Sequence, residues 1–200
     1  MKANQFQRHL AQLKGWRETA FILALAERAY PNFALFSQVV DFPGANAVAT
    51  CLEQGWGALV EHAEEDRYIE LLEQLEENVP NLENYDMYGA ATAVSFCEIL
   101  EQALLSQVNT EKRRASDTAQ NAFESVMDFL ETTEGEGLSE DELVKLFDQS
   151  PLIKREKAFQ EELVERLRKE SVPDEHVVTG LRVLASDEGV SNIGISLDEE

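Results

Sequence analysis

An acid and a base, Glu27 and Arg28, stand side by side in the most apolar part of this chain. A charged pair in such a segment must be hydrogen-bonded or lie at the mouth of a pocket, because an isolated buried charge is too costly. The functional hypothesis is a small-molecule pocket formed by Glu27, Arg28, Tyr30, Asn32, Asp86 and Tyr88. The structural alternative, which we favour, is a polar network in which Arg28 caps carbonyls or pairs with Asp41, Glu53 or Asp86.

Two stretches of the chain are almost purely acidic. Arg67 is the only Lys or Arg between residues 61 and 86, and Lys145 is the only one between residues 124 and 148. Such stretches are usually solvated helix faces. The alternative is a docking face for a basic protein, or an imitation of the phosphate field of DNA, formed by Glu64, Glu65, Asp66, Glu70, Glu73, Glu76 and Glu77. Residues 154–169 are mixed and basic, so this asymmetry could also serve self-association into a homo-oligomer.

Histidine and cysteine residues offer no pattern typical of a metal or catalytic site. His9, His62 and His176 lack the Glu three residues earlier that a di-metal site in a helical bundle requires. Cys51 and Cys97 have no neighbouring ligand at zinc spacing, and their apolar surroundings predict reduced, buried thiols. The sequence therefore predicts no metal, no cofactor and no catalytic residue, and it favours a non-catalytic role over an enzyme.

Length and charge narrow the classes of protein further. The chain has 200 residues, of which 44% are hydrophobic, so it can build a core as one domain. Its 39 acidic against 17 basic residues give a net charge of −22, which opposes direct binding to nucleic acid or to anionic membranes. No uncharged run approaches the ~20 residues that span a bilayer. Residues 1–14 lack the apolar core of a signal peptide, so we expect a cytoplasmic protein.

Helical periodicity dominates the whole sequence and predicts one all-α domain. We expect about seven to nine helices over residues 1–187, followed at residues 188–200 by a short extended C-terminal arm and an acidic tail. Residues 16–60 and 85–105 carry few charges and should form the core. In the arm the apolar residues should dock on the domain, whereas the last three residues should be loose; the docking residues are Val190, Ile193 and Ile195.

Several helix ends can be predicted from single residues. Pro31 should end the first core helix, because proline disfavours a helical conformation at the residue before it. Asp86 is the expected N-cap of the central helix. Ser139 and Glu142 have the spacing of a capping box.

Three blocks of the sequence resemble one family of bacterial proteins. Residues 27–36, ERAYPNFALF, are similar to an "ER-x-YPN-aromatic" signature, and residues 72–89, with YDMYG at their end, are similar to a second block. Residues 191–195, SNIGI, are similar to a third near the C-terminus. The chain thus resembles the YjaG-like proteins, domain-of-unknown-function family 416. The resemblance implies a compact all-helical fold and a cytoplasmic bacterial origin, and it carries over no activity, cofactor or catalytic residue.

Taken together, these patterns favour a non-catalytic cytoplasmic protein that binds a basic protein through an acidic surface. The second hypothesis, a small-ligand-binding protein or an enzyme with a pocket around Arg28, stays open at this point.

Overall fold

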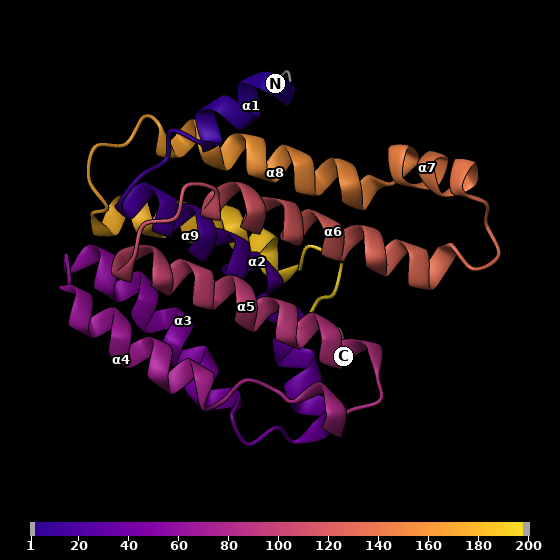
Figure 1. The fold of residues 1–200 in the computed structure, drawn as a ribbon, viewed down its shortest axis with the longest axis horizontal. Coiled ribbons are helices and arrows are strands. Elements are labelled where there is room, and N and C mark those ends of the chain that lie inside the picture. The colour runs from indigo at the N-terminus through magenta and orange to yellow at the C-terminus, as the bar shows by residue number, and fades with distance from the viewer. Residues whose placement is uncertain (1–2, 198–200) are drawn as a thin grey trace.

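The computed structural model describes residues 3–197, which form nine α-helices, two 3-10 turns and no strand (Figure 1). The helices are α1 (Ala3–Leu10), α2 (Trp16–Val40), α3 (Ala45–Val60), α4 (Glu65–Glu76), α5 (Tyr88–Val108), α6 (Arg114–Glu134), α7 (Glu140–Gln149), α8 (Pro151–Leu167) and α9 (Glu175–Ser186). The 3-10 turns are η1 (Leu82–Asn84) and η2 (Asp187–Gly189). The predicted all-α fold is confirmed, whereas the loose tail expected at residues 198–200 lies outside the described residues.

Helices α2 and α5 form the centre of the molecule and make its most extensive helix–helix contact. Every residue from 19 to 26 of α2 is buried, so this part of the helix has no solvent face, as its uncharged sequence predicts. On α5, the small residues Ala90 and Ala93 are fully buried where α2 lies close by. Helices α3 and α4 pack on one side of this centre, and α6, α8 and α9 pack on the other (Figure 1).

Helix α2 passes through Pro31 without ending there, so the prediction of a helix end at this residue was wrong. Proline has no N–H to donate to the carbonyl of Glu27, and its ring crowds that carbonyl, at a cost of about 3 kcal/mol. Tertiary packing offsets this cost. Phe33 and Phe36 lie beyond the proline and are each 1% exposed, and burying one such ring contributes about 1.5–3 kcal/mol.

The other helix ends agree with the sequence to different degrees. The capping box is present, because the backbone N–H of Ser139 donates to Glu142 Oε2 at 2.9 Å. Asp86 is not the N-cap of the central helix: α5 begins at Tyr88 after Met87, whose extended backbone takes the N-cap position. The polar sequence of residues 3–10 gave no indication of α1, although its Leu10 is fully buried.

A second, smaller core lies where the outer parts of α6 and α8 meet α7 and the C-terminal arm. Its buried members are Val126, Leu130, Ile153 and Ile193. Helix α7 covers the outer end of α6 and α8 and has no fully buried residue of its own (Figure 1). Across the described part of the chain, no helix combines the length and apolar character needed to cross a membrane.

Candidate functional site

Arg28 lies in the middle of α2 with its side chain enclosed by protein. Only 2% of the side chain is exposed, and its Nε donates to Oε2 of Glu156 on α8 at 2.9 Å. Glu156 is 1% exposed and also accepts a hydrogen bond from Gln160. The guanidinium stands 4.5 Å from the ring centroid of Phe159, a cation–π distance. Arg28 and Glu156 are therefore a buried ion pair that ties α2 to α8.

A second carboxylate, that of Asp187 in η2, reaches the same guanidinium. Asp187 Oδ2 lies 3.4 Å from Arg28 Nη1 and 3.7 Å from Nε of Arg155. Arg155 also donates through Nη2 to the carbonyl of Ser191. We call the five side chains of Arg28, Arg155, Glu156, Gln160 and Asp187 the Arg28 network. It joins α2, α8, the end of α9 and the C-terminal arm.

The C-terminal arm, residues 190–196, lies against α2 beside Pro31. The backbone N–H of Asn192 donates to the carbonyl of Arg28 at 3.3 Å. The Asn192 side chain accepts from Asn32 Nδ2 at 2.9 Å and donates to Oγ of Ser125 on α6 at 3.0 Å. Asn192 thus links α2 to α6 from the interior, since it is 3% exposed. Ile193 docks in the second core as expected and is 4% exposed.

Glu27 belongs to a separate set of contacts at the surface of α2. Its Oε2 accepts a hydrogen bond from Trp56 Nε1 on α3 at 2.8 Å, and its Oε1 lies 3.1 Å from Arg182 Nη2 on α9. Arg182 also donates to Glu53, which lowers the pKa of that carboxyl below its usual value. Glu27 and its neighbours therefore hold α2, α3 and α9 together.

The structure does not bring the six residues of the pocket hypothesis around one cavity. Tyr30 is half-buried against the ring of Phe96, with centroids 5.7 Å apart, and lines a small cavity of about 210 Å³ between α2 and α3. Asp86 is exposed before α5, and Tyr88 lines a different hollow between α5 and α6. Within the described residues, the charged partners of Arg28 are Glu156 and Asp187, not those expected from the sequence.

The charged partners of Glu27 and Arg28 are far away in the sequence, which is why local reasoning missed them. Glu156 is 128 residues from Arg28 and Arg182 is 155 residues from Glu27. One signal for Glu156 was present. It falls on the apolar stripe of α8, between Ile153 and Phe159, where a charge must find a buried partner.

An acidic groove lies between α5 and α6. It consists of a cavity of about 440 Å³ and a neighbouring one of about 260 Å³, which share Ser95, Glu98 and Asn121. Carboxylates line both parts of this α5–α6 groove: Glu98, Glu101, Glu111, Asp117, Glu124 and Asp128. Tyr88 stands at one end, and burial together with Asp128 raises the pKa of its phenol to about 12.

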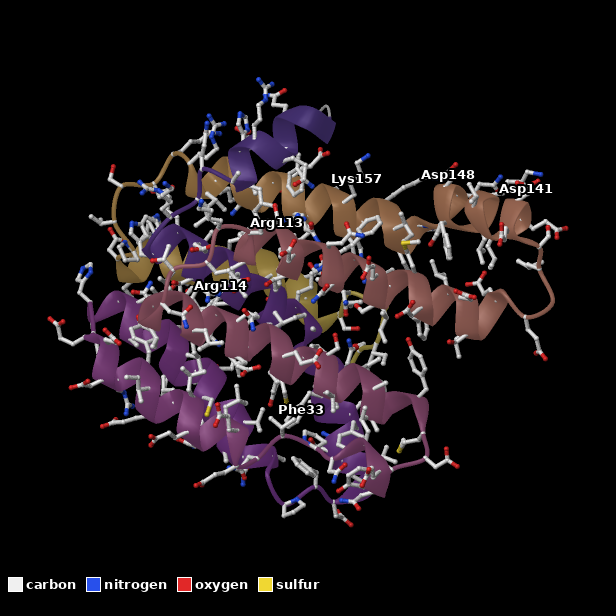
Figure 2. All side chains as sticks on the ribbon, viewed as in Figure 1. Phe33, Arg113, Arg114, Asp141, Asp148 and Lys157 are labelled. Carbon is white, nitrogen blue, oxygen red and sulfur yellow. The ribbon has the colours of Figure 1, made fainter. Side chains whose placement is uncertain are left out.

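The cations beside this groove are already engaged. Figure 2 shows Arg113 and Arg114 near the start of α6. The Arg114 side chain is 1% exposed and donates to Gln102 Oε1 at 3.2 Å and to the carbonyl of Asn109 at 2.8 Å. Arg113 is exposed and pairs with Asp117 at 3.1 Å. Arg114 therefore fixes the turn between α5 and α6, and within residues 3–197 most of the groove carboxylates have no cation at ion-pair distance.

Helix α4, which carries the predicted acidic face, packs against α5, one of the two helices that form the groove. All seven residues of that face are exposed: Glu64, Glu65, Asp66, Glu70, Glu73, Glu76 and Glu77. Burial raises the pKa of Glu101 in the groove, and Glu76 on α4 and Glu98 on α5 raise it further. The negative charges on α4 and α5 therefore repel one another. We call the α4 face and the α5–α6 groove together the acidic surface.

Metal ligands and reactive thiols are not assembled in the described part of the chain. No three or more His, Cys, Asp or Glu side chains between residues 3 and 197 are arranged to hold a metal ion. Cys51 and Cys97 are buried free thiols, and burial raises their pKa values to about 11 and about 12. Thiolate is thus scarce at neutral pH, and neither cysteine is placed as a nucleophile.

Comparison with known proteins places this architecture among bacterial relatives. The chain is 28% identical over 196 residues to the uncharacterized protein YjaG of Escherichia coli, and the alignment covers 98% of each sequence. It is 27% identical over 198 residues to an uncharacterized protein of Haemophilus influenzae, covering 98% of this chain and 99% of the relative. The crystal structure of a DUF416 family protein from Shewanella baltica superposes with a TM-score of 0.83 at 26% identity, over 95% of this chain and 97% of the other.

The chain also matches a protein-family model. Two blocks that carry the resemblance, around Arg28 and around Asn192, contact each other in the fold. The family model described as "Protein of unknown function (DUF416)" matches residues 5–196, so the chain belongs to the DUF416 family.

Proposed function

We propose that this protein is a non-catalytic cytoplasmic binding module that holds a basic protein on its acidic surface. The observation that carries the proposal is the run of carboxylates from the α4 face through the α5–α6 groove in a chain of net charge −22. The nearby cations Arg67, Arg113 and Arg114 each lie within ion-pair distance of an acid. The groove carboxylates of Glu98, Glu101, Glu124 and Asp128 have no cation within ion-pair distance among the described residues. Lys and Arg side chains of a partner would meet this unneutralised charge, which steers association.

The shape of the groove suits a segment of the partner rather than a flat contact. Its two cavities follow one another along α5 and α6 and could take extended basic side chains in succession. Tyr88 is 36% exposed at one end, where its ring could accept a cation.

The test compares variants that neutralise different parts of the acidic surface. Immobilised wild-type protein, a groove variant (Glu98→Gln, Glu101→Gln, Glu124→Gln) and an α4 variant (Glu73→Gln, Glu76→Gln, Glu77→Gln) would be exposed to native lysate. Retained proteins would be eluted by salt and quantified by mass spectrometry. A matched control removes three exposed acids elsewhere (Glu136→Gln, Glu140→Gln, Asp141→Asn); Figure 2 shows Asp141 at the outer end of α7.

We expect the wild type and the control to retain the same basic protein, and the groove or α4 variant to lose it. Release should occur as rising salt shortens the Debye length from ~10 Å to ~3 Å. Equal retention by all four proteins would contradict the proposal. If the wild type retains only its own copies, the acidic surface serves self-association, which sedimentation at low salt would reveal.

The alternative function is binding of a small ligand near Arg28. One observation favours it: Arg28 Nη2 is buried and has no hydrogen-bond acceptor in the part of the chain that the structure describes. Thermal-shift screening of wild-type protein against small metabolites tests this role directly, and a ligand effect that Asp187→Asn does not alter would argue against the Arg28 region as its site.

A further inference from the structure

Two arginine side chains, from different helices, converge on a single carboxylate oxygen. Arg28 Nη1 and Arg155 Nε lie 3.4 Å and 3.7 Å from Asp187 Oδ2. Charge-assisted hydrogen bonds between these groups are normally ~2.7–2.9 Å long. Asp187 therefore occupies the space between the two guanidiniums without bonding closely to either of them.

Both guanidiniums keep a buried donor that has no acceptor among residues 3–197. These donors are Arg28 Nη2 and Arg155 Nε. Arg28 as a whole is 2% exposed. An unsatisfied buried donor costs about 1–3 kcal/mol, and more when it is charged. The pair of arginines thus has donor capacity that the Asp187 carboxylate does not use.

The turn that holds Asp187 has a left-handed backbone. Asp187, Glu188 and Gly189 have φ values of 44°, 58° and 87°. Aspartate and glycine adopt this conformation readily, whereas it costs Glu188 roughly 1–2 kcal/mol. The Asp187 side chain is 42% exposed, so it lies on the solvent side of Arg28. It could leave the arginines and enter water without disturbing the core.

We infer that Arg28 and Arg155 form a binding site for an oxyanion, the phosphate or carboxylate group of a small ligand, and that Asp187 occupies this site until the ligand displaces it. The planar fork of a guanidinium matches the oxygens of such groups, and two forks can share one tetrahedral or planar anion. Glu156 neutralises one of the two arginine charges from the core side, so the site retains one net positive charge when Asp187 is released. This site is independent of the acidic surface, and either can fail without the other.

The test removes the Asp187 carboxylate, which competes with the ligand, and keeps the backbone of η2. Asp187→Asn eliminates the carboxylate, and asparagine tolerates the left-handed conformation well. Binding of inorganic phosphate, followed by calorimetry and thermal shift, should become about tenfold tighter than in the wild type, because the competent state is then fully populated. Succinate in a parallel titration distinguishes a carboxylate ligand from a phosphate one. Chloride at equal ionic strength controls for salt.

Two further variants keep the inference open to refutation. Asp141→Asn makes the same charge change on α7 and should leave phosphate binding at the wild-type level. Adding Arg155→Gln to Asp187→Asn should abolish the gain. The inference is overturned if Asp187→Asn binds phosphate and succinate no better than Asp141→Asn, or if chloride has the same effect. If Asp187→Asn does not fold, phosphate should raise the melting temperature of the wild type but not of Arg155→Gln, and equal shifts would overturn the inference.

Discussion

The Arg28 network and the acidic surface use the same side-chain types in opposite ways. In the network, carboxylates stand against guanidiniums: Glu156 pairs with Arg28 in the interior, and the partly exposed Asp187 lies beside Arg28 and Arg155. On the acidic surface, carboxylates from three helices gather with few cations between them. The difference shows that a net charge of −22 does not predict how charges are arranged in the interior. The excess is carried where water can solvate it, and charges that leave water are paired.

The two regions also differ in what their charges do for folding. Breaking a buried ion pair is costly because the partner left behind is a desolvated charge. Repulsion between exposed carboxylates is weak, since water and salt screen it. Substitutions should therefore separate the two regions by the size and the sign of their effect on the free energy of unfolding.

The largest effect is expected from Arg28→Met. This substitution leaves Glu156 buried without a cation and should lower the free energy of unfolding by about 3–5 kcal/mol, measured by urea denaturation. The double variant Arg28→Met, Glu156→Leu should recover most of that loss, because it removes both charges. Arg166→Met, which breaks an exposed pair with Glu162, serves as the control and should cost under about 1 kcal/mol. A loss for Arg28→Met as small as that of the control would contradict the contrast between the regions.

A smaller loss is expected from Asn192→Ala. The change removes the acceptor for Asn32 Nδ2 and the donor to Ser125, and it should cost about 1–3 kcal/mol. Hydrogen exchange of the amides in residues 191–195 should speed up together with the loss of stability. Leu197→Ala, at a 41% exposed position directly after the arm, is the control and should leave both unchanged. Unaltered exchange in Asn192→Ala would show that the side chain does not hold the arm.

The smallest effect, with the opposite sign, is expected from Glu101→Gln in the groove. Its pKa is raised in the folded state, so ionisation opposes folding: the stability that the protonated group contributes is present at low pH and is lost as the pH rises through the folded-state pKa. Relief of the repulsion with Glu98 should stabilise the fold by about 0.2–0.5 kcal/mol at neutral pH. The gain should be largest at neutral pH and smaller at an acidic pH, where the raised pKa of Glu101 leaves the wild-type carboxyl protonated.

Urea denaturation at both pH values measures this gain. Glu175→Gln, at an exposed position of α9 with no acid three or four residues away in the sequence, makes the same chemical change outside the groove and should not give this gain. A destabilising effect of Glu101→Gln would mean that this carboxylate is held by an attraction rather than exposed to repulsion.

Helix class and core could be predicted from the sequence because they depend on local periodicity. The uncharged stretch of α2 and the Ser139–Glu142 capping box are cases in which neighbouring residues decide the outcome. Pro31 is the opposite case, since a local rule predicts a helix end and tertiary packing overrides it. The partners of Arg28 depend on contacts between α2, α8 and η2, which no pattern within one segment encodes.

The acidic surface could be predicted only in part, because it also depends on contacts between distant segments. The acidic character of residues 61–86 is visible in composition, and all seven predicted docking residues are exposed. The α5–α6 groove could not be foreseen, because its carboxylates become neighbours only when α6 packs beside α5.

The contact between Asn32 and Asn192 also has a consequence for biosynthesis. The two residues are 160 positions apart, and at 5–20 residues per second a ribosome needs on the order of ten to thirty seconds to make the intervening chain. Glu156, the buried partner of Arg28, is itself 128 residues away, so for most of that interval the middle of α2 has neither the arm nor this carboxylate beside it. The contacts around Arg28 are therefore completed only after the C-terminal arm has been synthesised.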